Sequence, residues 1–204
     1  MFGKVASDVL GLSDIGSVIK PVDYEKADSD DYIMHEDGER IYFLIKSKSD
    51  EYCFTNKALI HLDGTSAASK KRVLRRMEFH KYQISNVLLE TAGTVDLDVE
   101  IKFKINSEIY SIDVHKKHLS EVKDLYKSLL KIGEITADNL IYSGYATESL
   151  QLASSTLGQV KADDIDVVKQ FKEVNQYAFD WLSEKKKEFS PKDFGFVFET
   201  FIQQ

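Results

Sequence analysis

The residues best suited to chemistry in this chain of 204 residues are one cysteine and five histidines. Cys53 stands between Tyr52 and Phe54 with no histidine nearby, which is typical of a packed thiol rather than a nucleophile. His115 and His118 are three residues apart, but no HxxxH, HExxH or cysteine–histidine cluster accompanies them. We therefore expect no metal site and no catalytic cysteine.

Three acids, Asp96, Asp98 and Glu100, alternate with apolar residues and suggest two uses. They could form a carboxylate pair or a calcium site, but the DxDxDG loop that holds calcium is missing. The alternation itself indicates the solvent face of a strand. Phosphate-loop, GxSxG and dinucleotide motifs are also absent from the sequence, so we predict no catalytic residue and no cofactor, and a protein that is not an enzyme.

The formal net charge of −7 hides one basic stretch. Residues 1–40 hold 4 basic and 10 acidic side chains, whereas residues 41–135 hold 16 and 13. An acidic chain argues against nucleic-acid binding, which needs a net basic face. The candidate ligand or lipid patch consists of Lys46, Lys48, Lys70, Lys71, Arg72, Arg75 and Arg76. The alternative is a solvated hairpin, or a subunit interface balanced by the acidic N-terminal segment.

The composition, with 43% hydrophobic and 30% charged residues and only 2 prolines, indicates a globular chain of one or two domains. Its lone cysteine fits a reducing compartment, and neither a signal peptide nor an apolar run of membrane-spanning length is found. We expect a cytoplasmic protein that contacts a membrane at most peripherally.

Period-two patterns and turn signals predict about seven strands with short connections. A short helix within residues 2–12 precedes them. The strands are expected at Ile41–Lys46, Tyr52–Thr55, Ala58–Leu62, Val73–Phe79, Ile84–Thr91, Val95–Ile105 and Glu108–Val114. The strand from Val95 alternates without error for 11 residues and places Val95, Leu97, Val99, Ile101, Phe103 and Ile105 on its core face.

After the last strand the period changes to 3.6, which predicts a long helix from Leu119 through Ile132 that closes the sheet. Helical texture continues to Leu157, with Gly144 and Gly158 as candidate breaks. Beyond it, apolar residues at a/d spacing predict a helix seam made of Val160, Val167, Phe171, Val174, Ala178 and Trp181. The seam serves either a second subunit or a helix of the same chain.

Ser190-Pro191-Lys192-Asp193 reads as the start of a last helix, with Ser190 as its N-cap. That helix carries Phe194, Phe196, Phe198 and Phe201, which must be buried on the domain or on another subunit. We assign these phenylalanines, with the seam, to a homo-oligomer interface.

Three stretches resemble the bacterial pleckstrin-homology (PH) family: Tyr52–Ile60, Tyr82–Val87 and Glu90–Asp98. The resemblance covers residues 1–135, and residues 136–204 resemble the YvbH-like oligomerisation region. It implies an α+β fold, a PH-like seven-stranded antiparallel β-barrel capped by a long helix and followed by a C-terminal helical hairpin.

Eukaryotic relatives bind inositol phosphates through a basic first hairpin, but here Lys46 and Lys48 are followed by Asp50 and Glu51 and no arginine. We therefore expect a scaffold or adaptor that homo-oligomerises through its C-terminal helices and presents a surface to a protein or peptide partner not identified by the sequence. The alternative is a peripheral membrane protein that binds anionic lipid through the basic patch.

Overall fold

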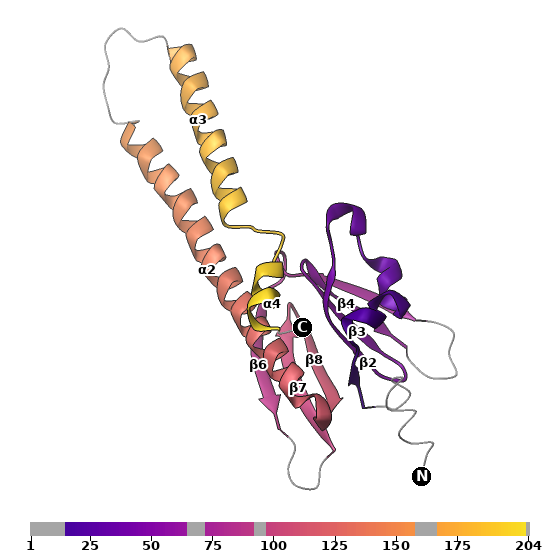
Figure 1. The fold of residues 1–204 in the computed structure, drawn as a ribbon. Coiled ribbons are helices and arrows are strands. Elements are labelled where there is room, and N and C mark those ends of the chain that lie inside the picture. The colour runs from indigo at the N-terminus through magenta and orange to yellow at the C-terminus, as the bar shows by residue number, and fades with distance from the viewer. Residues whose placement is uncertain (1–14, 65–71, 92–96, 158–166, 203–204) are drawn as a thin grey trace, which may run out of the picture. The chain divides into compact units, whose positions relative to one another are not determined.

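The computed structural model describes residues 15–64, 72–91, 97–157 and 167–202 (Figure 1). The chain forms two compact units. Residues up to 134 together with those from 192 onward form the first, and residues 135–191 form the second. The N-terminal helix predicted within residues 2–12, and Gly158, lie outside the described residues.

The first unit contains two antiparallel sheets. The five-stranded sheet has the order β1-β2-β3-β4-β5, and the three-stranded sheet has the order β6-β7-β8. Their strands are β1 Ser17–Val18, β2 Ile41–Lys46, β3 Glu51–Thr55, β4 Ala58–Asp63, β5 Val73–Glu78, β6 Ile84–Glu90, β7 Asp98–Ile105 and β8 Glu108–His115. The predicted α+β, PH-like fold is confirmed, with the short β1 added to the seven expected strands.

The sheets do not close into the predicted barrel, because β5 and β6 each end a separate sheet. A turn in which Lys81 N and Tyr82 N both donate to the carbonyl of Glu78 at 3.0 Å separates the two strands. On the other side, an isolated parallel bridge between Gly16 and Val114 links the region of β1 to β8. The result is an open pair of sheets.

Strand β7 shows how the pattern of the sequence builds the core. Val99, Ile101, Phe103 and Ile105 are buried and alternate with half-exposed polar residues, as predicted. The strand begins at Asp98, however, and Leu97 is 57% exposed. Its partner β8 ends at His115 opposite Asp98, so no core remains for Leu97 to cover. Val95 lies outside the described residues.

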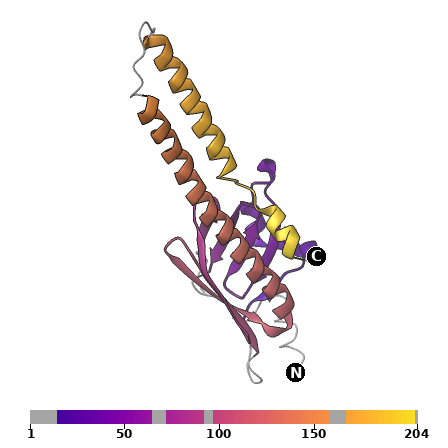
Figure 2. The same ribbon diagram turned by 90° about the vertical axis from the view of Figure 1, so that its left-hand side faces the viewer.

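The closing helix follows β8 directly through a 3-10 turn, η4 (Lys116–His118), and α2 spans Leu119–Leu157. Within the first unit, the helix lies across the sheets (Figure 2). Its side chains Val122, Leu125, Leu129 and Ile132 are fully buried, at the three- and four-residue spacing of one helix face. Gly133 allows close approach to β6, since a Cβ there would lie 2.6 Å from the carbonyl oxygen of Ile84.

Three further 3-10 helices, which the sequence patterns do not predict, precede β2: η1 (Pro21–Lys26), η2 (Asp28–Tyr32) and η3 (His35–Asp37). Ala27 and Ile33 from this acidic segment pack against Leu44, Cys53 and Ile60 of the five-stranded sheet. The segment therefore covers one face of that sheet although most of its residues are polar.

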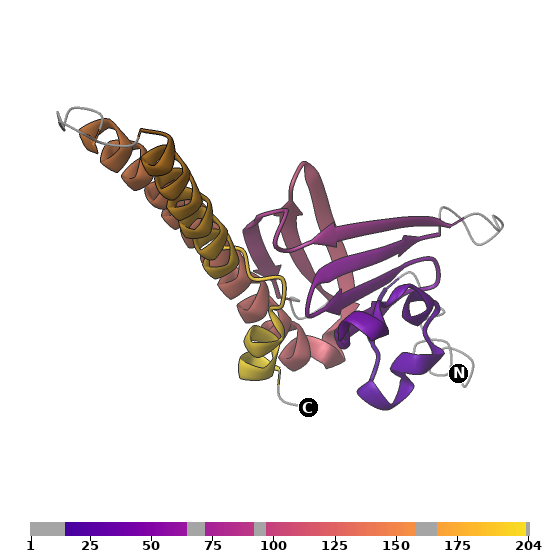
Figure 3. The same cartoon turned by 90° about the horizontal axis from the view of Figure 1, so that it is seen from above.

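The second unit is an antiparallel helix pair, formed by the part of α2 from residue 135 onward and by α3 (Val167–Glu188). The two helices run alongside each other in Figure 1 and Figure 2, and they overlap when seen from above in Figure 3. Tyr142 stacks on Phe189 with ring centroids 5.4 Å apart. α2 continues through Gly144, so the break considered there does not occur.

Candidate functional site

The basic patch predicted around β5 is largely neutralised by carboxylates of its own unit. Arg72 forms an ion pair with Asp28 of η2. Arg75 Nη1 lies 2.6 Å from Asp63 Oδ2 on the neighbouring strand β4. The Arg72 guanidinium, as hydrogen-bond donor, lowers the pKa of Asp28 below its usual value. Lys70 and Lys71 lie outside the described residues, so what the structure describes of this patch is a set of internal ion pairs.

Arg76 has a structural role instead of facing a ligand. Its Nη2 lies 3.0 Å from Oε1 of Glu39, whose side chain is fully buried. The Glu39 carboxylate also accepts hydrogen bonds from Thr55 Oγ1 at 2.6 Å and from Met34 N at 3.0 Å. The arginine therefore balances a buried charge that holds η3 against the sheet.

The first hairpin, between β2 and β3, lacks a phosphate cradle. Lys46 pairs with Glu51, a nearly buried carboxylate that also accepts from Ser29 N at 2.9 Å. Lys48 is exposed in a tight turn closed by a 2.8 Å hydrogen bond from Ser47 N to the Asp50 carbonyl. Of these two lysines, Lys46 is half-buried in an ion pair and Lys48 is exposed, so the two side chains do not form a common binding site.

Cys53 and Glu100, two of the residues considered for chemistry, are part of the packing and ion pairs of the first unit. Cys53 is fully buried in a cluster with Ala27, Ile33, Leu44 and Ile60, and burial raises the pKa of its thiol. Glu100 pairs with Lys102 at 2.8 Å on the face of β7 opposite the core. In the part of the chain that the structure describes, no group of three or more His, Cys, Asp or Glu side chains could hold a metal ion.

The C-terminal tail differs from its prediction. α4 spans Gly195–Phe201 and starts after Phe194, not at Ser190-Pro191, because Asp193 Oδ1 accepts from Gly195 N at 2.8 Å and thus supplies the capping oxygen. Asp193 Oδ2 also accepts from the Asn56 side chain at 2.6 Å. These bonds tie the start of α4 to the turn between β3 and β4.

Two of the predicted interface phenylalanines, Phe194 and Phe198, are fully buried in the first unit. Phe198 stacks on Tyr42 with centroids 5.3 Å apart, and Phe194 meets Phe79 edge-on at 6.0 Å. They complete the core of the domain and are not available to a second subunit. Phe196 is exposed and Phe201 is half-buried.

The helix pair of the second unit presents an unusual amount of apolar surface. Phe171 is 71% exposed, Phe179 67% and Tyr177 65%. The other exposed apolar or aromatic residues of this unit are Leu140, Ile141, Tyr142, Tyr145, Leu152, Val174 and Leu182. Isolated apolar residues on a surface are ordinary, whereas so many on one helix pair are typical of an interaction surface.

The predicted seam residues fall on two sides of α3. Val174 and Ala178, together with Tyr177, line a groove of about 650 Å³ against Leu150 and other residues of α2. Trp181 is half-buried and Lys185 Nζ lies 5.0 Å from the centre of its ring, whereas Phe171 faces solvent. Val160 and the side chain of Val167 lie outside what the structure describes.

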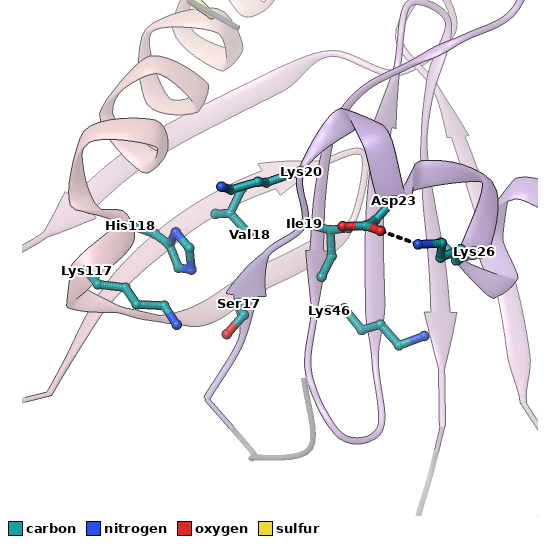
Figure 4. Close-up of a pocket in the computed structure, with 10 residues that line it drawn as sticks. Ser17, Val18, Ile19, Lys20, Asp23, Lys26, Lys46, Lys117 and His118 are labelled. Atoms are coloured by element: carbon teal, nitrogen blue, oxygen red, sulfur yellow. Dashed lines mark hydrogen bonds and ion pairs between the residues drawn. The ribbon is translucent and has the colours of Figure 1, made fainter. Parts of the chain in front are cut away.

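A second pocket, of about 540 Å³, was not expected from the sequence. It is lined by Ser17, Val18, Ile19, Lys20, Asp23, Lys26, Ala27, Lys46, Lys117 and His118 (Figure 4). Lys117 and His118 follow the other lining residues by 71 positions or more, and no local motif marks either group. Only the pairing of β1 with β2, and the bridge from Gly16 to β8, bring them together.

Comparison with known proteins agrees with this architecture. The family described as Bacterial PH domain matches residues 9–132, more than half of the chain. The chain belongs to the bacterial PH-domain family. The YvbH-like oligomerisation region matches residues 144–204.

Two proteins of Bacillus subtilis (strain 168) are similar to this PH-domain chain. Uncharacterized protein YvbH is 54% identical over 202 residues, which cover 99% of each chain. Uncharacterized protein YozO is 31% identical over 110 residues, 53% of this chain and 90% of its own. A crystal structure of a PH domain containing bacterial protein from Exiguobacterium sibiricum 255-15 has a TM-score of 0.86 and 52% identity, covering 93% of this chain and 100% of that one. The likeness to YvbH and to the crystal structure spans both units of the chain.

Among the helices that the structure describes, none combines the length and the apolar character needed to cross a bilayer.

Proposed function

We propose that this PH-domain protein is a non-enzymatic scaffold or adaptor, and that its helix pair binds a second copy of the same chain. The observation that carries the proposal is the exposed apolar surface of the second unit, with Phe171, Tyr177 and Phe179 each more than half exposed. The match of residues 144–204 to the YvbH-like oligomerisation region supports the same conclusion.

A second copy of the chain is the partner that best fits the apolar surface of the helix pair. Two helices alone cannot enclose an apolar stripe on both, because each buries only the side that faces its neighbour. The groove between α2 and α3 has small residues on its walls, including Ala153, Ser154 and Ala178, which leave room for side chains from another helix. A symmetric partner brings a face of the same composition, so each copy covers the other.

The adaptor part of the proposal places a partner peptide at the edge of the five-stranded sheet. β5 has β4 on one side and no strand on the other among the described residues. Val73 and Leu74 on this edge are exposed. An unpaired strand edge can accept an extended peptide through main-chain hydrogen bonds. A peptide selected against the whole protein should lose binding on Val73→Lys with Leu74→Lys; retained binding would rule this edge out.

Light scattering on the full chain at micromolar concentration tests the assembly. The wild-type protein should have a mass of at least two chains, and Phe171→Glu with Phe179→Glu should return it to one chain, because assembly would bury two unpaired charges. Ile109→Glu is the matched control, since Ile109 is equally exposed but belongs to β8 of the first unit. A monomeric wild type, or a multimer lost in the control as well, contradicts the proposal.

A further inference from the structure

The pocket beside β1 gathers cations in an acidic protein. Four of its lining residues are lysines and one is a histidine, whereas Asp23 is the only acid among them. Asp23 is already engaged, since its Oδ1 lies 2.6 Å from Lys26 Nζ. Lys46 is likewise paired, with Glu51. These two ion pairs leave Lys20 and Lys117 to determine the charge of the pocket.

Lys20 and Lys117 have no ion-pair partner within the described residues. Figure 4 shows the Lys20 side chain extending toward the side of the pocket formed by Lys117 and His118. Two ammonium groups on one pocket that are not paired with a carboxylate attract an anion, and each can give a charge-assisted hydrogen bond.

His118 adds a polar atom that lacks a partner. Its Nδ1 lies 3.3 Å from Glu121 Oε1, while Nε2 is buried and has no hydrogen-bond partner in the described structure. Since a carboxylate only accepts, Glu121 fixes the ring proton on Nδ1 and leaves Nε2 of the neutral ring as an acceptor. A ligand hydroxyl such as P–OH, or a proton taken up with a fully ionised anion, would satisfy it once the ring turns to bring this buried atom to the pocket.

The surroundings of the pocket favour a small phosphorylated molecule. His118 immediately precedes α2, a helix of 39 residues whose N-terminal end carries a positive partial charge. Val18, Ile19 and Ala27 contribute an apolar wall, and about 540 Å³ is more space than a bare phosphate fills. The pocket therefore offers cations for an anionic head and apolar surface for the group attached to it.

We propose that the pocket formed by β1, η1, the end of β2 and the start of α2 binds a phosphate monoester through Lys20, Lys117 and His118. The phosphate belongs either to a small metabolite or to a lipid headgroup. Of the described residues of the predicted basic patch, only Lys46 lines this pocket, whereas Arg72, Arg75 and Arg76 pair with carboxylates elsewhere. The site does not depend on the proposed assembly, because all its residues belong to the first unit.

NMR or calorimetric titration of the full-length protein tests the site with three probes: inorganic phosphate, glycerol 3-phosphate, and vesicles of phosphatidylcholine containing phosphatidic acid. Glycerol 3-phosphate should bind, and Lys20→Gln with Lys117→Gln should weaken it at least about tenfold, since two charge-assisted hydrogen bonds are lost. Lys104→Gln is the control and should change the affinity for glycerol 3-phosphate by less than about twofold. The chain enters the pocket after His115, which pairs with Asp98 at one end of β7, whereas Lys104 lies near the other end of that strand.

The probes separate the two sources of phosphate. Binding of glycerol 3-phosphate without vesicle binding identifies a metabolite site, and vesicle binding lost in the double variant identifies a lipid headgroup site. His118→Gln, which keeps a polar side chain, should reduce affinity less than the double variant does. The proposal fails if none of the probes binds at millimolar concentration, or if Lys104→Gln weakens binding as much as the double variant.

Discussion

Phe103 of β7 is 2% exposed, whereas Phe171 of α3 is 71% exposed. The first packs against Phe54 and Tyr110, at centroid distances of 6.1 and 5.1 Å, inside a pair of sheets closed by α2 and α4. The second lies on a helix with a single neighbouring helix. The same side chain is thus part of a finished core in one unit and part of an open surface in the other.

This difference is the basis of the two roles that we propose for the chain. In the first unit, Phe198 of the C-terminal tail packs on the sheet, and the arginines of β5 form ion pairs with carboxylates of the same unit. The second unit leaves apolar area uncovered, and burying one large apolar side chain is worth about 1.5–3 kcal/mol. That free energy is available only to a partner, so assembly is expected from the helix pair and ligand binding from the first unit.

The largest effect is expected from Val99→Asp. Val99 is buried in β7, and a carboxylate there would have no partner, so we expect the first unit to unfold. Asp98→Asn, on the half-exposed neighbour, should leave the melting temperature nearly unchanged. An unshifted melting curve for Val99→Asp would mean that β7 presents its other face to the core.

Phe198→Ala tests whether the tail belongs to the first unit. Removing a fully buried ring that stacks on Tyr42 should cost about 3–5 kcal/mol of unfolding free energy in chemical denaturation. Phe196→Ala, in the same helix but exposed, should cost under about 0.5 kcal/mol. Equal costs for the two would show that α4 is not docked as described.

Arg76→Gln should destabilise the first unit by about 2–3 kcal/mol, because it leaves the buried Glu39 carboxylate without its cation. Arg72→Gln removes a pair whose members are both about half exposed, so its cost should be under about 1 kcal/mol. Urea denaturation at neutral pH measures both. A larger loss of unfolding free energy for Arg72→Gln than for Arg76→Gln would contradict the expectation that the buried ion pair stabilises the unit more than the exposed one.

A smaller effect concerns pH. Burial, the main cause, lowers the pKa of His61 from its usual 6.5, although the ring lies beside Asp50, and burial does the same to His118. The folded state then binds fewer protons than the unfolded state, so stability should fall as pH drops below about 6.5. Denaturation at pH 7.5 and 5.5 measures this, and His61→Gln should reduce the difference. Equal stability of the wild type at the two pH values would contradict it.

The smallest effect on folding is expected from Phe171→Glu alone. Its side chain faces solvent in one chain, so the unfolding free energy of the first unit should change by less than about 0.5 kcal/mol. The same variant should weaken assembly in light scattering. Loss of stability in the first unit at a concentration where the protein is monomeric would contradict this expectation.

The strands and the long helix could be read from the sequence because their signals are local. Seven strands agree with their predicted positions to within a few residues, since each is a period-two run bounded by turn residues. β7 shows the limit, because the alternation extends to Val95 but the strand starts where its partner ends. A pattern determines which face a residue takes, and pairing determines where the strand stops.

Tertiary structure alone decided what the tail, the basic patch and the pocket do. Phe194 and Phe198 looked like interface residues because nothing local reveals that Asp193 binds Asn56, 137 residues away, and brings α4 back to the sheet. The sequence does not show that Arg72 and Arg75 are paired, because their carboxylates come from η2 and from β4. Lys20 and His118 line one pocket because β1 pairs with β2 and Gly16 forms a bridge to β8. Composition and periodicity report which side chains must be buried or solvated, whereas contacts between distant segments depend on how the elements pack.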